Sequence, residues 1–289
     1  MKGRDPRSVL HGAGLRPKKS FGQNFLVAMP IAQAIAGACV RDGEVGRARV
    51  VEIGAGTGVL TRLLAERARE LFAIERDRDL VPILTGELAS DRVHILEEDA
   101  QSVDFARLLG PESAESPRVL CGNLPYAITG SLLRRAVESA ASFERAVFMV
   151  QDEVATRLVA PPGGKDRGAL TVFVQAAFDV RRVLRVSPGS FHPPPRVTSA
   201  VVELTTLRPP RAVETPCFQA LVRGAFQARR KTLRNAWSGI GTDAMALARA
   251  AERAGVLLEA RGETLEVDAF ARMAAALETC DARGPLIDG

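Results

Sequence analysis

The feature that most constrains this chain is a glycine loop between a strand and a helix. Residues 51–58 read VEIGAGTG; they continue a short β-branched run, 49–53, and lead into a segment, 58–68, whose apolar residues have helical spacing. Glycines at such a junction allow a sharp turn and let a ligand approach the backbone closely. The pattern indicates an α/β fold with a ligand at this turn, although a tight turn without a ligand would read the same in isolation.

The spacing within the loop favours one class of ligand. A dinucleotide fingerprint would be G-x-G-x-x-G, whereas Gly54, Gly56 and Gly58 give G-x-G-x-G, with Glu52 just before them. A carboxylate is poorly placed beside a pyrophosphate but well placed beside a cation. S-adenosylmethionine carries a sulfonium and an ammonium group and no phosphate, so it fits this loop better than a nicotinamide dinucleotide does.

Acidic residues also follow the next two predicted strands. Glu75 ends the run 70–74, and Glu97, Glu98 and Asp99 follow the run 93–96. An acid at the second strand end can accept hydrogen bonds from both ribose hydroxyls, and one at the third can accept from the adenine amine of the cofactor. Each alone would be an ordinary surface acid. Three acids at successive strand ends, where open sheets bind ligands, favour a methyl-donor fold.

Strands and helices alternate through the first part of the chain, which predicts a mainly parallel sheet covered on both faces. A late antiparallel pair of strands, 180–186 and 197–204, follows. After Pro209 and Pro210 only helical patterns remain. Further strands are predicted at 118–121 and 146–150, and helices at 77–88, 131–139, 218–237, 243–254 and 268–277. We therefore expect a basic flexible tail at 1–20, a methyltransferase domain at 21–208 and a helical domain at 209–289.

The fourth predicted strand ends in a string, 122–126, that reads GNLPY and contains the only tyrosine, Tyr126. The amine of adenine is a poor nucleophile because its lone pair is delocalised into the ring. The Asn123 side-chain oxygen and the Leu124 backbone carbonyl could accept its two hydrogens and favour the pyramidal form, while Tyr126 stacks on the base. In isolation the string would also suit a proline turn with a capping asparagine.

A second aromatic candidate is Phe191, in a loop, 187–195, that its prolines make rigid. Such a loop could hold Phe191 on the other face of an extruded base. An apolar plug between two strands is an equally good interpretation.

Charge adds a weaker indication. The formal net charge is +5, and residues 1–26 carry six cations against one acid. The segment 223–234 contains no acid and holds five cations. Such clusters suggest a polyanionic partner, although 34 of the 39 cations are arginine, and an arginine-rich composition would also produce them. The second cluster consists of Arg223, Arg229, Arg230, Lys231 and Arg234.

Other classes of protein are disfavoured. The four cysteines and three histidines lack metal-ligand spacing, so we expect no metal site and reduced cysteines. No apolar run approaches the roughly 18–20 residues that a membrane span needs. We expect a cytoplasmic protein without a membrane partner, and a monomer, because no long apolar stripe is left unpaired.

Five strings together resemble the ribosomal RNA adenine dimethyltransferase family, of the type that modifies the bacterial small subunit. They lie in order over roughly residues 16–280, and the set is far more specific than the Asn-Leu-Pro-Tyr string alone. The strings occupy residues 21–26 (FGQNFL), 52–58, 123–126, 191–199 (FHPPPRVTS) and 226–235 (FQARRKTLRN).

The resemblance implies a fold and a reaction. The fold is a Rossmann-like class I S-adenosylmethionine methyltransferase domain with a small C-terminal all-helical domain. The reaction is dimethylation of the exocyclic amines of two adjacent adenines in the 3′-terminal hairpin loop of 16S ribosomal RNA, within the pre-30S subunit, late in its assembly. The implied cofactor residues are Asn24, Leu26, Gly54, Gly56, Glu75, Asp99 and Asn123, and the implied catalytic residues are Asn123, Leu124, Tyr126 and Phe191.

Two positions depart from the family pattern. Ala127 stands where the family often has asparagine, and Arg167 where it usually has an aromatic residue. Three rival functions stay open on the sequence: a large-subunit adenine methyltransferase of the macrolide-resistance type, a binding protein that keeps the fold without catalysis, and a methyltransferase acting on small molecules or protein amines.

Overall fold

A computed structural model describes residues 5–113, 115–227, 230–240 and 242–281. The chain divides into two compact units. The first contains Met1–Ala155 and Val180–Thr206, and the second contains Thr156–Asp179 and Leu207–Gly289. The segment 156–179, which the sequence analysis places in the first domain, belongs to the second unit together with the chain from Leu207 on.

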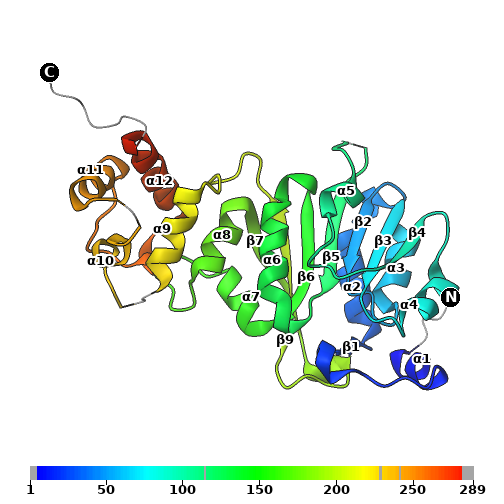
Figure 1. Ribbon diagram of the computed structural model, residues 1–289. Coiled ribbons are helices and arrows are strands. Elements are labelled where there is room, and N and C mark those ends of the chain that lie inside the picture. Colours follow the sequence, from blue (N-terminus) through cyan, green and yellow to red (C-terminus); the bar gives the residue numbers. More distant parts are fainter. Residues whose placement is uncertain (1–4, 114, 228–229, 241, 282–289) are drawn as a thin grey trace. The chain divides into compact units, whose positions relative to one another are not determined.

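Seven strands of the described chain form the sheet of the first unit (Figure 1). The strand order is β4-β3-β2-β5-β6-β9-β7. Strands β2 to β6 pair in parallel, and β9 pairs antiparallel to β6, with Phe148 opposite Val202. The strands are β2 (Arg49–Ile53), β3 (Glu70–Glu75), β4 (Val93–Glu97), β5 (Arg118–Asn123), β6 (Arg145–Gln151), β7 (Phe178–Val186) and β9 (Ser199–Thr206).

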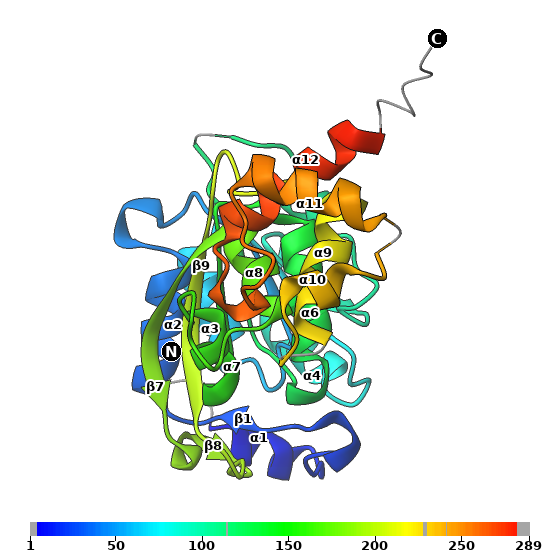
Figure 2. The same ribbon diagram turned by 90° about the vertical axis from the view of Figure 1, so that its left-hand side faces the viewer.

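Helices cover both faces of this sheet, as the alternating pattern predicts. Val50 and Val147 point to one face, where they share a core with Ile35 of α2 and Leu64 of α3. Helix α4 packs on this same face through Leu88. Figure 2 shows α6 on the opposite side of the sheet from α2. The helices of this unit are α1 (Pro6–Gly12), α2 (Met29–Cys39), α3 (Val59–Arg67), α4 (Val81–Leu88), α5 (Phe105–Leu109) and α6 (Thr129–Glu138), while α7 (Asp152–Leu158) crosses into the second unit.

Strand order explains where a ligand can bind. The chain leaves β2 for β3 on one side and later returns to place β5 on the other side. Loops therefore diverge from the carboxyl ends of β2 and β5, and open α/β sheets bind ligands in the crevice at such a point. The fold class predicted from the sequence is confirmed.

The N-terminal segment differs from the prediction of a loose tail. Its described part, 5–20, contains α1, which Asp5 caps by accepting a hydrogen bond from the Arg7 N–H. Leu10 of α1 packs with Phe25 and Leu80. The glycines, prolines and charges suggested disorder, but Pro6, Val9 and Leu10 of α1 are buried.

A second, two-stranded sheet joins residues 25–26, just after this segment, to the proline-rich loop. Strand β1 (Phe25–Leu26) pairs antiparallel with β8 (Phe191–His192), so Leu26 lies opposite Phe191. Strands β7 and β9 are neighbours in the main sheet, in line with the predicted late pair, and β8 lies in the connection between them.

The second unit is helical, as predicted, with one break that the sequence did not reveal. The predicted helix 218–237 is two helices, because the N–H groups of Leu233 and Arg234 donate to the carbonyls of Ala260 and Leu258. Trp237 is buried and its indole N–H donates to the Leu221 carbonyl. The helices are α8 (Ala169–Ala177), α9 (Pro216–Gln227), α10 (Leu233–Trp237), α11 (Ala244–Ala254) and α12 (Val267–Asp281). No described helix is long and apolar enough to span a bilayer.

The close approach of β2 and β5 predicts a mutational effect. A Cβ at Gly122 would lie 2.3 Å from the Ile53 carbonyl oxygen. We expect Gly122→Ala to push the two strands apart and destabilise the protein by about 1–3 kcal/mol. Gly130→Ala is the matched control, because nothing lies within 4 Å of its added methyl group and alanine favours helix α6. Equilibrium urea denaturation followed by circular dichroism tests this, and equal midpoints for the two variants would contradict the steric argument.

Candidate active site

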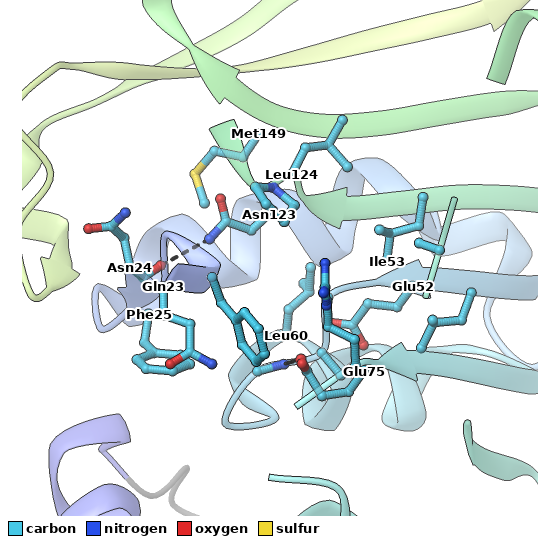
Figure 3. Close-up of a pocket in the computed structure, with 18 of the residues that line it drawn as sticks. Gln23, Asn24, Phe25, Glu52, Ile53, Leu60, Glu75, Asn123, Leu124 and Met149 are labelled. Carbon is cyan, nitrogen blue, oxygen red and sulfur yellow. Dashed lines mark hydrogen bonds between the residues drawn. The ribbon is translucent and has the colours of Figure 1, made fainter. Parts of the chain in front are cut away.

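A cavity lies at the carboxyl ends of β2, β3, β4 and β5 (Figure 3). Seven predicted cofactor residues all line it, although they come from segments up to about a hundred residues apart in the chain. They are Asn24, Leu26, Gly54, Gly56, Glu75, Asp99 and Asn123. Two of the predicted catalytic residues, Leu124 and Tyr126, line the same cavity.

The glycine loop forms the floor of the cavity and needs its glycines. Gly54, Gly56 and Gly58 have φ values of 74°, 60° and 80°, in the left-handed region that side chains disfavour. A Cβ at Gly56 would also lie 3.2 Å from the Phe25 ring. The loop therefore turns sharply from β2 into α3 and leaves the backbone open to a ligand.

Glu75, the predicted ribose acid, holds the loop in place. Its Oε2 accepts from the Gly56 N–H at 2.8 Å, and its Oε1 accepts from the Asp77 N–H at 2.8 Å. Burial raises the pKa of Glu75, and these two hydrogen bonds oppose the rise. Each carboxylate oxygen can accept a further hydrogen bond, so the group can serve ribose hydroxyls without releasing the loop.

Glu52 is buried, and its Oε2 has no hydrogen-bond partner among the described residues. Burial raises the pKa of Glu52 to about 8; the nearby Glu75 carboxylate adds to the rise and the Thr61 hydroxyl opposes it. The group lines the cavity. An unpartnered buried carboxyl is costly unless it is neutral or receives a donor or a cation. A ligand with a positively charged end supplies that partner.

Asn123 is oriented from the N-terminal side of the cavity. Its Nδ2 donates to the backbone carbonyl of Asn24 at 3.1 Å. Figure 3 shows the Asn123 oxygen turned away from Asn24, on the side of Met149. The N–H of Leu124 donates to the Met149 carbonyl at 3.0 Å, which fixes the turn that follows β5. Since the amide nitrogen is engaged, the Asn123 oxygen is the group left to accept a hydrogen bond.

Tyr126 is partly buried and anchored at its hydroxyl. Its Oη lies 2.8 Å from the Oγ of Ser199, the fully buried first residue of β9. Burial raises the pKa of Tyr126, against the effect of the Ser199 hydrogen bond. The ring is thus fixed by its tip while it lines the cavity, as a stacking platform requires.

Phe191 behaves differently from the prediction of a stacking ring. It is 3% exposed, shares a core with Leu26 and Val186, and is not among the residues that line the cavity. In this structure it is the apolar plug that the sequence left open as an alternative. Its contact with a target base stays a prediction.

The two residues that depart from the family pattern, Ala127 and Arg167, lie outside the cavity described above. Ala127 is exposed and follows the Tyr126 turn. Arg167 is buried in the second unit, where its guanidinium donates to the Ala160 carbonyl and the Gln175 side chain. Arg167 is therefore a packing residue of the helical unit.

Several cavity residues are absent from the predicted site. Among them, Phe21 and Gln23 line the cavity from the segment 18–26, which we call the strap, and Arg76 lines it from the turn after β3. The Arg76 guanidinium lies 4.7 Å from the centre of the Phe21 ring and 3.4 Å from Asp99. The predicted adenine acceptor is thus paired with a cation. Arg76 carried no signal, because a charged residue after a strand is ordinary.

The predicted RNA cluster lies on the second unit. Arg223 is exposed on α9, and Arg230 and Lys231 are exposed in the turn before α10. Arg234 pairs with Glu259 at 2.6 Å. Arg229 lies outside the described residues. No group of three or more metal-ligating side chains occurs in the described chain.

This fold, with an acid at each of three strand ends and an oriented asparagine beside a glycine loop, defines an S-adenosylmethionine-dependent methyltransferase. The sequence profile described as "Ribosomal RNA adenine dimethylase" matches residues 14–279. The chain belongs to the ribosomal RNA adenine dimethylase family.

Curated relatives with this activity in their names align with nearly the whole chain. Ribosomal RNA small subunit methyltransferase A of Anaeromyxobacter sp. is 44% identical, over 93% of this chain and 96% of its own length. The protein of the same name from Geobacter metallireducens is 40% identical, over 93% of this chain and 98% of its own.

Two solved structures share the fold. A dimethyladenosine transferase from Plasmodium falciparum has a TM-score of 0.74 at 22% identity, and covers 88% of this chain and 98% of its own. The 23S rRNA methyltransferase ErmE has a TM-score of 0.65 at 25% identity, and covers 88% of this chain and 100% of its own.

The buried Glu52 predicts a pH dependence of stability. Its folded pKa, about 8, exceeds the ordinary value of 4.5. Between these values the folded chain binds a proton that the unfolded chain lacks, so the stability this group contributes is lost as pH rises toward 8. We expect the ligand-free protein to lose up to about 1.4 kcal/mol per pH unit relative to Glu52→Gln in this window.

Urea denaturation of both proteins from pH 5.5 to 8.5 measures the difference. The glutamine variant keeps the shape of the side chain without its titration, so it isolates this group from Glu75. Parallel pH profiles for the two proteins would show that Glu52 is ionised throughout.

Proposed function

We propose that this chain dimethylates the exocyclic amines of two adjacent adenines in the 3′-terminal hairpin loop of 16S ribosomal RNA, on the pre-30S subunit in the cytoplasm, and that it acts as a monomer. The observation that carries the proposal is the oriented Asn123 side chain at the tip of β5. The small-subunit enzymes named among the relatives support this target over a large-subunit one, since their identity of 40–44% exceeds the 25% shared with ErmE.

The residues present fit the cofactor. Glu75 is placed to accept from ribose hydroxyls, Asp99 from the adenine amine, and the unpartnered Glu52 to face the positively charged methionine end. When bound, S-adenosylmethionine supplies a methyl group already activated by its sulfonium. The protein therefore has to position the amine and polarise it, and a strong general base is unnecessary.

Asn123 and Leu124 do this work in the proposal. The Asn123 oxygen and the Leu124 carbonyl accept the two hydrogens of the adenine amine, which localises the lone pair on nitrogen as it attacks. No donor in the described chain occupies the Leu124 carbonyl. Tyr126 stacks on the extruded base, whose removal from its neighbours costs a few kcal/mol and least in a loop.

The second methylation adds a constraint on the site. The monomethylated amine retains one hydrogen and has to rotate within the same pocket before it reacts again. Tyr126 is held at its hydroxyl by Ser199, and Tyr126 and Leu124 both line the cavity. A pocket defined by two acceptors and a flat ring tolerates the added methyl group better than a closely fitted one.

RNA binding is assigned to the exposed cations Arg223, Arg230 and Lys231, together with Arg234 and the sequence neighbour Arg229. Such contacts neutralise phosphates and position the RNA without reading its sequence. Specificity then comes from the shape of the RNA and the state of the assembling subunit.

Replacing Asn123 with Ala tests the polarising role. We expect methyl transfer to fall by at least about a hundredfold, a loss typical of removing one preorganised acceptor or donor, while cofactor affinity changes little. Methyl incorporation into isolated 30S particles and calorimetric titration of the cofactor measure the two effects. Near-normal turnover would refute the role of Asn123.

The same assay separates the rival functions. The wild-type chain should label 30S and leave 50S particles unlabelled. Labelling of 50S particles alone would point to the large-subunit activity. Cofactor binding without labelling of either particle would leave a binding protein or an enzyme for other amines.

Salt dependence tests the basic cluster. We expect the double variant Arg230→Ala, Lys231→Ala to weaken binding to an RNA hairpin of the 3′-terminal sequence. The plot of log affinity against log salt, which falls with salt, should become less steep by about 1.4. The pair Arg249→Ala, Arg272→Ala, on α11 and α12 of the same unit, should leave the slope unchanged. Filter binding over a salt series measures both, and equal slopes for the two pairs would remove the cluster from the RNA contact.

A further inference from the structure

Asp77 is a buried carboxylate to which the proposed reaction gives no role. Its side chain is 2% exposed and lies two residues beyond Glu75. Its Oδ1 accepts from the Lys18 Nζ at 2.5 Å and from the Asp79 N–H at 3.1 Å, and its Oδ2 accepts from the Gln23 Nε2 at 2.7 Å. Both carboxylate oxygens are therefore engaged, and two of the three donors belong to the strap.

Two strap residues, Lys18 and Gln23, bond both to this carboxylate and to each other. The Lys18 N–H donates to the Gln23 Oε1 at 2.7 Å, so the two residues that hold Asp77 also hold each other. Between them, the Phe21 ring lies under the cations of Lys18 and Arg76, at 5.5 Å and 4.7 Å from its centre. The amide of Gln23 accepts on one side and donates on the other, which fixes its orientation.

The strap in turn forms part of the active site. Residues 21–26 line the cofactor cavity, and the Asn24 carbonyl accepts the hydrogen bond that orients Asn123. At the other end of the network, the Asp77 N–H donates to Glu75. Asp77 is thus the residue through which the ribose acid, the strap and the Asn123 amide are joined.

We propose that Asp77 is a positioning residue for methyl transfer, which holds the strap so that the Asn24 carbonyl can orient Asn123. The proposal rests on the function assigned to Asn123. Lys18 and Asp77 are 59 residues apart in sequence, so the contact is a tertiary clamp and no part of a local turn. Burial would raise the pKa of Asp77, but the hydrogen bonds from Lys18, Gln23 and the Asp79 backbone hold it below its usual value.

A purely structural role is the competing explanation. Buried ion pairs often add little net stability, yet removing one partner leaves an uncompensated charge and destabilises the fold as a whole. A positioning role predicts a local effect instead: the strap should loosen, and the reaction should lose rate at saturating cofactor, while the sheet and the helical unit stay intact.

The test compares Asp77→Asn with Asp79→Asn in the full chain. Asparagine keeps the size of the side chain. Its amide N–H, however, would face another donor, either the Lys18 ammonium or the Gln23 amide. Asp79 is the matched control, because it also pairs with Lys18, at 2.7 Å, but is half exposed, and the Gln23 amide donates to Asp77 instead. Hydrogen-exchange mass spectrometry without cofactor reports the strap directly.

We expect amides of residues 18–26 to exchange about tenfold faster in Asp77→Asn than in the wild type, and those of α9 to α12 to be unchanged. Cofactor should bind about tenfold more weakly, and kcat at saturating cofactor should fall as well. Loss of a cofactor contact alone would raise the KM and leave kcat unchanged. The Asp79→Asn protein should resemble the wild type in all three measurements.

Lys18→Met provides a second route, because it breaks the same clamp from a partly exposed position. Its effect on strap exchange should largely disappear when it is introduced into Asp77→Asn, as expected for residues that act as a pair. Strap exchange in Asp77→Asn and Lys18→Met equal to that in Asp79→Asn would overturn the clamp. An unchanged kcat in Asp77→Asn would overturn its effect on Asn123. If the wild type binds no cofactor, the proposed function fails, while the exchange data still decide whether Asp77 holds the strap.

Discussion

One carboxylate, that of Glu75, fixes the geometry of the whole cofactor cavity. It accepts the Gly56 N–H from the glycine loop and the Asp77 N–H from the turn after β3. Both turns carry polar backbone groups that would be left without partners at a partly buried strand end. A side chain without an acceptor at position 75 would free both turns at once. The predicted ligand residue is therefore also a structural residue, and the two roles use different lone pairs of the same group.

Two acids of the cavity, Glu52 and Glu75, are buried close together, and the Glu75 carboxylate adds to the cost of ionising Glu52 in the ligand-free protein. Both are buried, and the pKa of each is raised mainly by burial. Glu75 has two backbone donors, whereas the Glu52 Oε2 has no hydrogen-bond partner in the described chain. A site that keeps one acid neutral until a cation arrives avoids the penalty of a buried unpaired charge. The same arrangement disfavours phosphate-bearing nucleotides, since they would bring negative charge to an acidic site.

Sequence reasoning found the residues that periodicity places at strand ends. Glu75 and Asn123 follow buried β-branched runs, so their positions at one edge of the sheet come from the strand pattern itself. The strap could not be found in this way, because its anchor joins Lys18 to Asp77, 59 residues away, with several strands and helices between them. The break before α10 was missed for a similar reason: the N–H groups of Leu233 and Arg234 find acceptors in residues 258–260, which no local pattern reveals. The role of Phe191 could not be predicted from the sequence for a different reason: an aromatic residue in a rigid loop suits a core and a binding surface equally well.

Ion pairs already engage two of the six cations in the N-terminal segment. The basic N-terminus suggested a phosphate-binding tail, but Arg7 pairs with Asp5, and Lys18 pairs with Asp77 and Asp79. A cation in a buried or fully satisfied pair releases few counterions when a phosphate approaches, because its charge is already balanced. Arg223, Arg230 and Lys231 are exposed on the helical unit, and the described part of the chain pairs none of them with an acid. In the proposed function, Asn123, Leu124 and Tyr126 of the first unit hold the base, whereas the phosphate contacts that position the RNA without reading its sequence come from the helical unit.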